Sequence, residues 1–240
     1  MAKQLDFEYG SASSRPMRAL FRTGAVQFTQ TSATDLTCDI RDVEALSASK
    51  SDLKSYSNLD EFAEACCQHL IAHVDELQLH RLLQHSELRI LRSSNKGDYF
   101  EWRCWDGRVT LTNAGGSHHF AAARYIAGKL RLKVPLSGRL YRHSLVREGV
   151  SVLRDGYLVY AVGFPSIDQF FELSELINST GAEWCARALP LPHRGLSLVL
   201  FFPRADKRSL EVASVFHDAK FEEFGERLHV WAHRPHQWSH

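Results

Sequence analysis

The stretch from Gly107 to Arg147 constrains the fold most. A strand-like segment at 108–112 enters a glycine-rich turn, a helix is predicted from Ser117 to Lys129, and an apolar strand follows around 132–136. This succession of strand, turn, helix and strand predicts a helix that covers one side of a sheet.

The turn has the composition of an anion-binding site. Gly115 and Gly116 lack a β-carbon, so an oxyanion could approach their N–H groups closely and the chain could take positive φ without strain. Ser117 is a predicted N-cap, the helix dipole would favour negative charge there, and Arg124 would lie two turns further on the same face. The alternative is an ordinary strand–turn–helix corner in which the glycines only permit close packing.

Charge is distributed unevenly along the chain. The formal net charge is +1, but residues 107–147 contain no acidic residue and eight basic ones, so the other residues together carry −7. Such a segment concentrates positive potential around the glycine turn. A solvated basic face, including Arg139, Arg142 and Arg147, is the other interpretation. This face could bind DNA, RNA or an acidic protein.

Residues 106–128, followed by Leu132-Lys-Val-Pro-Leu, resemble the nucleotide-binding core of the ParB/sulfiredoxin-like superfamily. Proteins of that superfamily have a strand, a glycine turn with His or Arg, an alanine-rich helix and a short strand that often contains Val-Pro. The resemblance implies a small α/β domain that holds the phosphates of ATP or CTP, with Mg²⁺, at the start of the helix.

Within this resemblance, the positions that match are Gly115, Gly116, His118, Ala121 and Ala122. Two positions differ. Ser117 stands where sulfiredoxin has its catalytic cysteine, which excludes reduction of sulfinic acids by that route. His119 stands where the superfamily has an arginine that grips phosphate. A neutral imidazole offers one donor, so phosphate binding should be weaker and should strengthen toward about pH 6 as His119 gains charge.

Two functions follow as hypotheses. The first is binding of a nucleotide or another phosphorylated ligand, with NTPase or phosphotransferase activity left open and Asp106 or Glu101 as the carboxylate of an enzyme. The phosphate would be held by Gly115, Gly116, Ser117, His118, His119 and Arg124. The second is a non-catalytic interaction protein that uses the basic face at 124–147. No Walker A sequence, GxSxG elbow or HExxH helix occurs.

The whole chain is predicted to have an α+β (mixed α/β) fold, and 44% hydrophobic residues are enough for a core. An irregular region is expected at 1–57, the ParB/sulfiredoxin-like core at 58–150, and a C-terminal α/β extension at 151–240. Within them we predict a helix from Asn58 to Gln84, strands at 88–92 and 99–105, and a β-α-β-β-α succession from Tyr157 onward.

No metal site is predicted. Cys66, His69 and His73 have helical spacing, but histidines beside an apolar stripe are more often hydrogen-bonded than metal-bound. The histidine-rich tail from His229 is expected to be exposed or packed at an edge, and the five cysteines are expected to be reduced thiols. No apolar run approaches the roughly 18 residues of a membrane span, so no membrane partner and a cytoplasmic location are expected.

Overall fold

The computed structural model of the chain describes residues 8–11, 27–92, 97–188 and 196–233. It divides into two compact units. Unit 1 contains the described residues among 1–30 and 145–235, and unit 2 contains those among 31–144. Residues 31–57 therefore belong to the same unit as the glycine turn.

Unit 2 is built on a five-stranded sheet with the order β2-β6-β4-β5-β3. Its strands are β2 (Thr29–Asp39), β3 (Ala45–Leu46), β4 (Tyr99–Arg103), β5 (Val109–Thr112) and β6 (Pro135–Leu145). β4 is antiparallel to β5 and parallel to β6, and β3 is parallel to β5. Its helices are α2 (Leu59–Cys66), α3 (Glu76–Leu83) and α4 (Ser117–Leu130), with short 3-10 helices η2 (Ile40–Asp42), η3 (Leu53–Ser55) and η4 (Arg89–Leu91).

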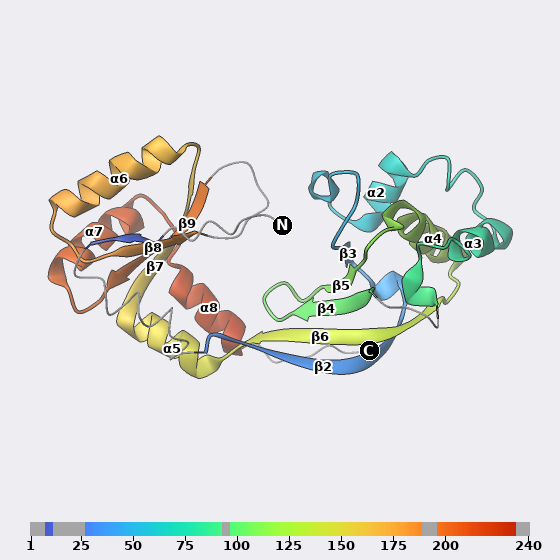
Figure 1. Ribbon diagram of the computed structural model, residues 1–240, viewed down its shortest axis with the longest axis horizontal. Helices are drawn as coiled ribbons and strands as arrows, with labels where there is room; N and C mark the ends of the chain where they lie inside the picture. The colour runs from blue at the N-terminus through green and yellow to red at the C-terminus, as the bar shows by residue number, and fades with distance from the viewer. Residues whose placement is uncertain (1–7, 12–26, 93–96, 189–195, 234–240) are drawn as a thin grey trace. The chain divides into compact units, whose positions relative to one another are not determined.

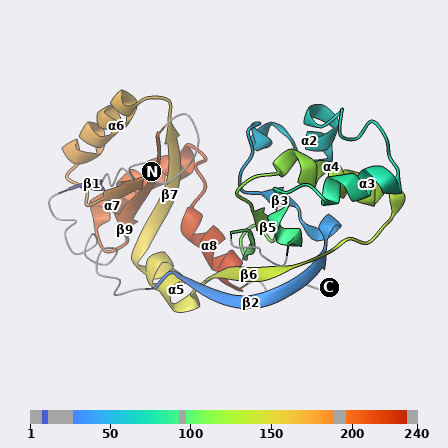
Figure 2. The ribbon, with the colours of Figure 1, turned by 45° about the vertical axis from the view of Figure 1, so that its right-hand side comes forward.

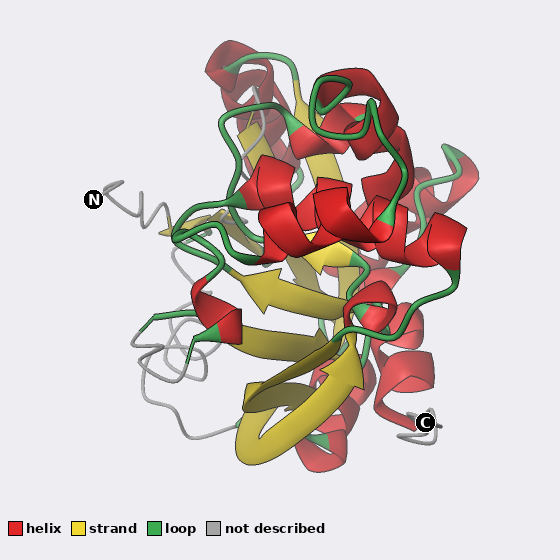
Figure 3. Ribbon diagram, turned by 90° about the vertical axis from the view of Figure 1, so that its right-hand side faces the viewer, coloured by secondary structure: helices red, strands yellow, loops and turns green. Residues whose placement is uncertain are grey.

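Helix α4 is the centre of unit 2. Its buried positions carry Phe120, Ile126 and a run of alanines, which let neighbouring elements approach closely. Both α2 and α3 pack against it, and the three helices stand together on one side of the strands (Figures 1–3). The predicted order of strand, glycine turn, helix and strand is confirmed, although β6 begins at Pro135 and continues to Leu145.

The predicted helix from Asn58 to Gln84 is wrong in its middle. Asn58 does cap a helix, since its Oδ1 accepts hydrogen bonds from the N–H groups of Asp60 and Glu61 at 3.0 and 2.9 Å. However, α2 ends at Cys66, and Asp75 caps a second helix by accepting from Gln78 N at 2.7 Å. A second strong N-cap favours a new start over a continuous helix.

Two further expectations for unit 2 are wrong. Residues 88–92, predicted as a strand, contain η4, which buries Leu88 and Ile90. The strands that pair with β4 are β5 and β6, and residues 93–96, between the two predicted strands, lie outside the described residues. Residues 1–57 are not irregular throughout, because 29–39 form the long strand β2.

Unit 1 is a four-stranded antiparallel sheet with helices on both faces. Its strands are β1 (Glu8–Gly10), β7 (Tyr157–Phe164), β8 (Cys185–Ala188) and β9 (Leu196–Pro203), in the order β1-β8-β9-β7. Its helices are α5 (Arg147–Gly156), α6 (Ile167–Ser179), α7 (Lys207–Asp218) and α8 (Phe224–His233).

Alternate residues of β7, β8 and β9 enter two separate cores. Leu198, Leu200 and Phe202 of β9 pack with residues of α6 and α7, whereas Val199 and Phe201 pack with α5 and α8. Helices on both faces explain why β9 is a continuous apolar run and not an alternating one. Figure 1 shows α6 on one side of this sheet and α5 and α8 on the other.

The β-α-β-β-α succession predicted from Tyr157 is confirmed as β7, α6, β8, β9 and α7. Ser166 caps α6 by accepting from Gln169 N at 3.4 Å. Helix α8 covers residues that the sequence analysis treated as a tail, and His236 and His240 lie outside the described residues. Together the two units give the predicted α+β class. None of the helices in the described ranges has the length and apolar character needed to cross a membrane.

Candidate functional site

A cavity of about 480 Å³ lies in unit 2 where the glycine turn meets α4. The turn follows β5, and residues 47–51 follow β3, so both loops leave the same edge of a parallel strand pair. This is where polar side chains from distant segments meet in such sheets. The polar side chains that line the cavity are those of Ser49, Lys50, His69, Glu87, Ser117, His118 and His119.

Asn113 holds the two loops together. Its buried side chain donates to the carbonyl oxygens of Ala48 and Gly115 at 3.1 and 2.9 Å, and its Oδ1 accepts from Ala48 N at 3.3 Å. Its own N–H donates to Ser47 Oγ at 3.1 Å. Because buried amide groups are stable only when hydrogen-bonded, this side chain fixes the distance between residues 47–49 and the turn.

Of the two glycines expected to allow positive φ, Gly116 takes it and Gly115 does not. Gly116 is the N-cap of α4 with a left-handed backbone at φ 72°, and no side chain caps the helix from this position. The prediction of Ser117 as the N-cap is therefore wrong. Ser117 is the first helical residue, is buried, and donates its hydroxyl to Ser49 Oγ at 3.0 Å.

The carboxylate of Glu87 occupies the start of α4. Its Oε2 accepts a hydrogen bond from Gly116 N at 2.9 Å. A β-carbon at Gly116 would lie 3.0 Å from the Glu87 carbonyl oxygen, and one at Gly115 would lie 3.2 Å from Glu87 Cδ. The two glycines therefore make room for an oxyanion at the positive end of the helix.

Residues 107–147 contain no acidic residue, but in the folded chain two carboxylates from outside this segment lie next to the turn. Besides Glu87, the buried residue Asp98 accepts from Ala114 N at 3.2 Å. These two carboxylates lie 29 and 16 residues before their partners in the chain. At the turn, the positive charge of residues 107–147 is therefore accompanied by acidic neighbours, because folding brings Glu87 and Asp98 from outside this segment.

His119 lies in a cluster of imidazoles. Its ring stacks on that of His85, with centroids 3.5 Å apart and planes 16° from parallel. Burial lowers the pKa of His119 below its ordinary value of 6.5, and the neighbouring His85 lowers it further, against the opposing effect of Glu87. The gain of charge that we expected toward pH 6 therefore shifts to lower pH.

His118 is held by hydrogen bonds at both ring nitrogens. Its Nδ1 lies 3.3 Å from Ser117 Oγ and its Nε2 lies 3.1 Å from Ser51 Oγ. Phe62 packs against the ring at a centroid distance of 5.1 Å. These contacts fix the plane of the imidazole beside the cavity.

Arg124, expected to add charge at the phosphate, lies elsewhere. Its guanidinium donates to the carbonyl oxygens of Val43 and Arg41 at 2.9 and 3.2 Å and forms an ion pair with Asp60. Seven residues of helix place it about 10 Å along the axis from Ser117, so a shared helical face does not bring it to the turn. Arg124 ties α4 to α2 and η2.

The three arginines of the expected basic face belong to two units and make different contacts. Arg139 and Arg142 are three residues apart on β6, so their side chains leave opposite faces of the sheet, and Arg147 belongs to unit 1. Arg139 pairs with Asp35 at 3.1 Å, and the Arg142 guanidinium lies 5.8 Å from the Trp102 ring. Arg147 donates to Ala232 O at 3.2 Å.

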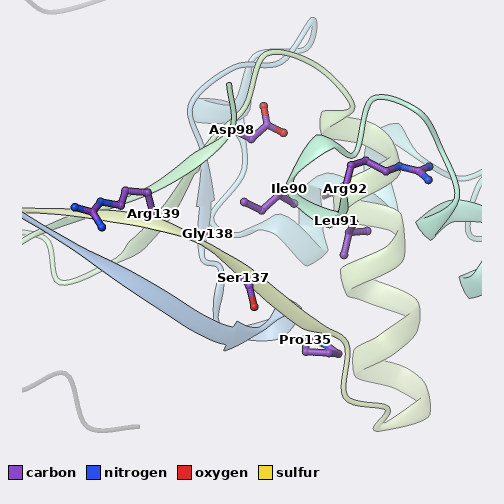
Figure 4. A pocket seen from close by; sticks show the side chains of 8 residues that line it. All are labelled: Ile90, Leu91, Arg92, Asp98, Pro135, Ser137, Gly138 and Arg139. Atoms are coloured by element: carbon purple, nitrogen blue, oxygen red, sulfur yellow. The ribbon is translucent and has the colours of Figure 1, made fainter. Parts of the chain in front are cut away.

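A second cavity of about 550 Å³ includes Arg139 on its lining (Figure 4). Figure 4 shows the side chains of Arg139 and Arg92 pointing away from one another. Arg92 donates to the carbonyl oxygens of Gln84 and His85, which anchors the loop that carries Glu87. The two guanidinium groups therefore do not converge on a common anion.

The other expected chemical residues also lie apart from the turn. Glu101 pairs with Arg103, and Asp106 accepts from Arg108 N at 3.0 Å, so neither lines the cavity. Because α2 ends at Cys66, the helical spacing expected for Cys66, His69 and His73 does not exist. The described residues contain no group of three or more His, Cys, Asp or Glu side chains arranged to hold a metal.

Several residues of this site were missed from the sequence. Ser49, Lys50, Ser51, His85 and Glu87 lie 28 to 66 residues before Gly115 in the printed sequence. Their only sequence signal is the clustering of Ser and Lys at 47–51, which is typical of any surface loop. The parallel pairing of the two-residue strand β3 with β5 decides the position of residues 49–51, and Arg92 anchors the loop that carries Glu87.

Searches of curated proteins and of solved structures found no match to this chain. A scan of protein families matched residues 33–239 to one family, described as a family of unknown function (DUF6685). The match covers most of the chain and includes the residues that line the cavity of unit 2 and strands β7, β8 and β9 of unit 1. The chain therefore belongs to the DUF6685 family.

Proposed function

We propose that the cavity at the start of α4 binds a phosphorylated small molecule, and that a nucleotide such as ATP or CTP is the class to test first. The observation that carries this proposal is the hydrogen bond from Gly116 N to the Glu87 carboxylate at 2.9 Å. The turn already accepts an oxyanion from its own chain. A phosphate oxygen has the same charge and acceptor geometry, and it would take the place of this carboxylate.

The groups around Glu87 favour a ligand larger than one carboxylate. The first N–H groups of a helix have no partner within it, and no acceptor is found among the described residues for those of Ser117, His118 and His119. Lys50 supplies positive charge at the cavity wall, and Ser49 supplies a hydroxyl. These donors, together with the helix dipole, match the several oxygens of a phosphate.

The resemblance of residues 106–136 to the ParB/sulfiredoxin-like superfamily points to the same ligand class. That superfamily holds nucleotide phosphates at the equivalent helix start. Here His119 replaces the arginine that grips phosphate, and its stacking on His85 and lowered pKa make it a neutral donor. Recognition therefore falls to the N–H groups and Lys50. Mg²⁺ belongs in the test because carboxylates such as that of Glu87 are among its preferred ligands.

Isothermal titration with ATP, CTP and GTP, with and without Mg²⁺, tests the proposal. The wild-type chain is compared with Glu87→Gln, which removes the competing charge but keeps the size of the side chain. We expect the variant to bind about two- to fivefold more tightly, the equivalent of the 0.3–1 kcal/mol typical of a charge at a helix start. Glu211→Gln in unit 1 makes the same change of net charge and should have no effect.

Absence of binding by both proteins at millimolar nucleotide would contradict the nucleotide proposal. Equal weakening of every ligand by Glu87→Gln would show that this carboxylate takes part in binding and does not compete with the ligand.

The alternative, a non-catalytic protein that binds nucleic acid or an acidic protein through a basic face, remains a hypothesis from the sequence. Within unit 2, Arg139 pairs with Asp35 and the Arg142 guanidinium lies against the Trp102 ring, so each side chain already has a contact within its own unit. A mobility-shift assay across salt concentrations tests it, because phosphate contacts produce a steep salt dependence.

A further inference from the structure

Four polar side chains form a continuous hydrogen-bonded chain beside the cavity. Ser117 Oγ lies 3.0 Å from Ser49 Oγ and 3.3 Å from His118 Nδ1, and His118 Nε2 lies 3.1 Å from Ser51 Oγ. Ser49, Ser117 and His118 line the cavity, and Ser51 is half-buried next to them. The chain therefore joins the loop after β3 to the first turn of α4.

The donors and acceptors in this chain can be assigned in order. The Ser117 hydroxyl donates its single proton to Ser49 Oγ, so Ser117 Oγ can meet His118 Nδ1 only as an acceptor. His118 then carries its proton on Nδ1 and has a free lone pair on Nε2. Since Ser51 Oγ lies 3.1 Å from Nε2, the Ser51 hydroxyl donates to it.

This arrangement has the three parts of an activated nucleophile: a hydroxyl, a base that accepts its proton, and a third group that orients the base. Ser51, His118 and Ser117 fill these parts in that order. Two other serines of this region are hydrogen-bonded to groups other than an imidazole, since Ser47 accepts from Asn113 N and Ser55 donates to the Asp52 carboxylate. The nearest thiol, Cys67, donates to His118 O and stays protonated because burial raises its pKa to about 11.

Ser51 also lies close to the proposed phosphate site. Its N–H donates to Ser49 Oγ at 3.2 Å, which folds residues 49–51 into a tight turn. Ser49 and Lys50 of this turn line the cavity together with Gly116 and Ser117. A ligand held at the start of α4 therefore meets the loop that carries Ser51.

We propose that Ser51 is the nucleophile that attacks the phosphorus atom of the ligand bound in this cavity, with His118 as its base and Ser117 as a positioning residue. This inference rests on the proposed function. A lone pair of Ser51 Oγ forms a bond to phosphorus, and the hydroxyl proton passes to His118 Nε2. The P–O bond to the leaving group breaks, its electron pair goes to the leaving oxygen, and the imidazolium protonates that oxygen. The product is phosphoserine at position 51.

An alkyl fluorophosphonate tests the nucleophile directly, because it reacts with an activated serine by forming an Oγ–P bond and releasing fluoride. Wild-type protein is incubated with the reagent, and the labelled peptide is mapped by mass spectrometry. We expect one label, at Ser51. His118→Gln should slow labelling by roughly 100-fold or more, the lower end of the range for general base catalysis. Ser117→Ala should slow it less, and Ser55→Ala should leave it unchanged.

Labelling at another serine, or no labelling of the wild-type protein, would overturn the proposal, and this readout requires no variant to fold. Equal rates for the wild type and a His118→Gln protein with unchanged thermal unfolding would overturn the role of His118. Nucleotide titration of Ser51→Ala separates the two proposals, because removal of the nucleophile should leave binding intact. Labelled Ser51 in a protein that binds no nucleotide would support the nucleophile and contradict the nucleotide as its ligand.

Discussion

The first backbone N–H groups of helices α4 and α7 need hydrogen-bond acceptors from outside the helix, and the two helices obtain these acceptors differently. At α7, Asp206 accepts from Ser209 N at 2.8 Å, so the cap comes from the residue next to the helix. At α4, the capping position is a glycine without a side chain, and the acceptor is Glu87, 29 residues earlier. The start of α7 is capped by a neighbouring residue in the sequence, whereas the start of α4 is capped by a side chain from a separate loop.

This difference separates a structural helix start from a binding one. Asp206 also accepts from Glu183 N and Ser209 Oγ, and these hydrogen bonds hold the pKa of its carboxyl below the ordinary value. An external anion would have to break several local bonds to replace it. Glu87 is exposed and accepts one bond at the turn, so an external oxyanion can replace it at lower cost. The predictions below test this contrast.

Substitution of Gly116 should have the largest effect. Gly116→Ala puts a β-carbon on a backbone with φ 72° and 3.0 Å from the Glu87 carbonyl oxygen. Left-handed strain and overpacking against backbone together should lower the free energy of unfolding by about 2–4 kcal/mol. Urea unfolding measures the loss.

Gly115→Ala is the matched control for Gly116→Ala. Its β-carbon would meet only the Glu87 carboxyl group, at 3.2 Å from Cδ. Because this group ends a flexible side chain, it can move away, and the loss of stability should be well below that of Gly116→Ala. Equal losses for the two variants would show that the close approach of the Glu87 backbone is not what selects glycine.

Removal of the local cap at α7 should have the next largest effect. Asp206→Ala leaves the N–H groups of Ser209 and Glu183 without their acceptor. Loss of an N-cap of this kind costs about 1–2 kcal/mol. Asp206→Asn should recover most of the loss, because asparagine caps helices nearly as well. Denaturant unfolding of the three proteins checks the order, and an unaffected Asp206→Ala protein would contradict it.

Neutralising Glu87 should cost less stability than removing Asp206. In Glu87→Gln the amide oxygen can still accept from Gly116 N, but the interaction of a full charge with the helix start is lost. The free energy of unfolding should fall by about 0.3–1 kcal/mol at low salt, and the difference should shrink as salt screens the charge. A loss equal to that of Asp206→Ala would contradict the contrast between the two helix starts.

The smallest effect concerns His119 and pH. Burial and His85 lower the pKa of His119 in the folded chain below its ordinary value of 6.5, so the unfolded chain binds the proton more readily. Stability should therefore be lost as pH falls below the unfolded value toward the folded one. His119→Phe, which keeps an aromatic ring against His85, should lose less stability than the wild type between about pH 7.5 and 5. Parallel pH profiles of the unfolding midpoint would contradict this cause.

The local elements of this chain are readable from its sequence where one segment carries the whole signal. Asn58 caps a helix where one is predicted, and the succession of β7, α6, β8, β9 and α7 follows the pattern predicted from Tyr157 onward. The predictions at 58–84 and 88–92 fail for the same reason. A second cap at Asp75 and burial of Leu88 and Ile90 under a 3-10 turn outweigh the periodicity there.

In the candidate site, too, only the features that depend on neighbouring residues were predictable from the sequence. Its glycines were identified because a left-handed turn before a helix has a signature in neighbouring residues. Ser51 and Glu87 were not identified from the sequence. The position of Ser51 depends on the pairing of β3 with β5, and that of Glu87 depends on the loop held by Arg92. Arg124 was assigned wrongly to the cavity because helical periodicity predicts a face but not a distance along the axis.

By itself, the sequence determined the α+β class, most helix starts in the described residues, and the glycine turn that begins α4. Short-range hydrogen bonds and steric rules decide these features. The tertiary structure alone decided that a carboxylate fills this turn and that His118 lies between two serines. These contacts join residues that are up to 68 positions apart. Only the packed fold, which fixes the spacing between loops, can bring such residues within hydrogen-bonding distance.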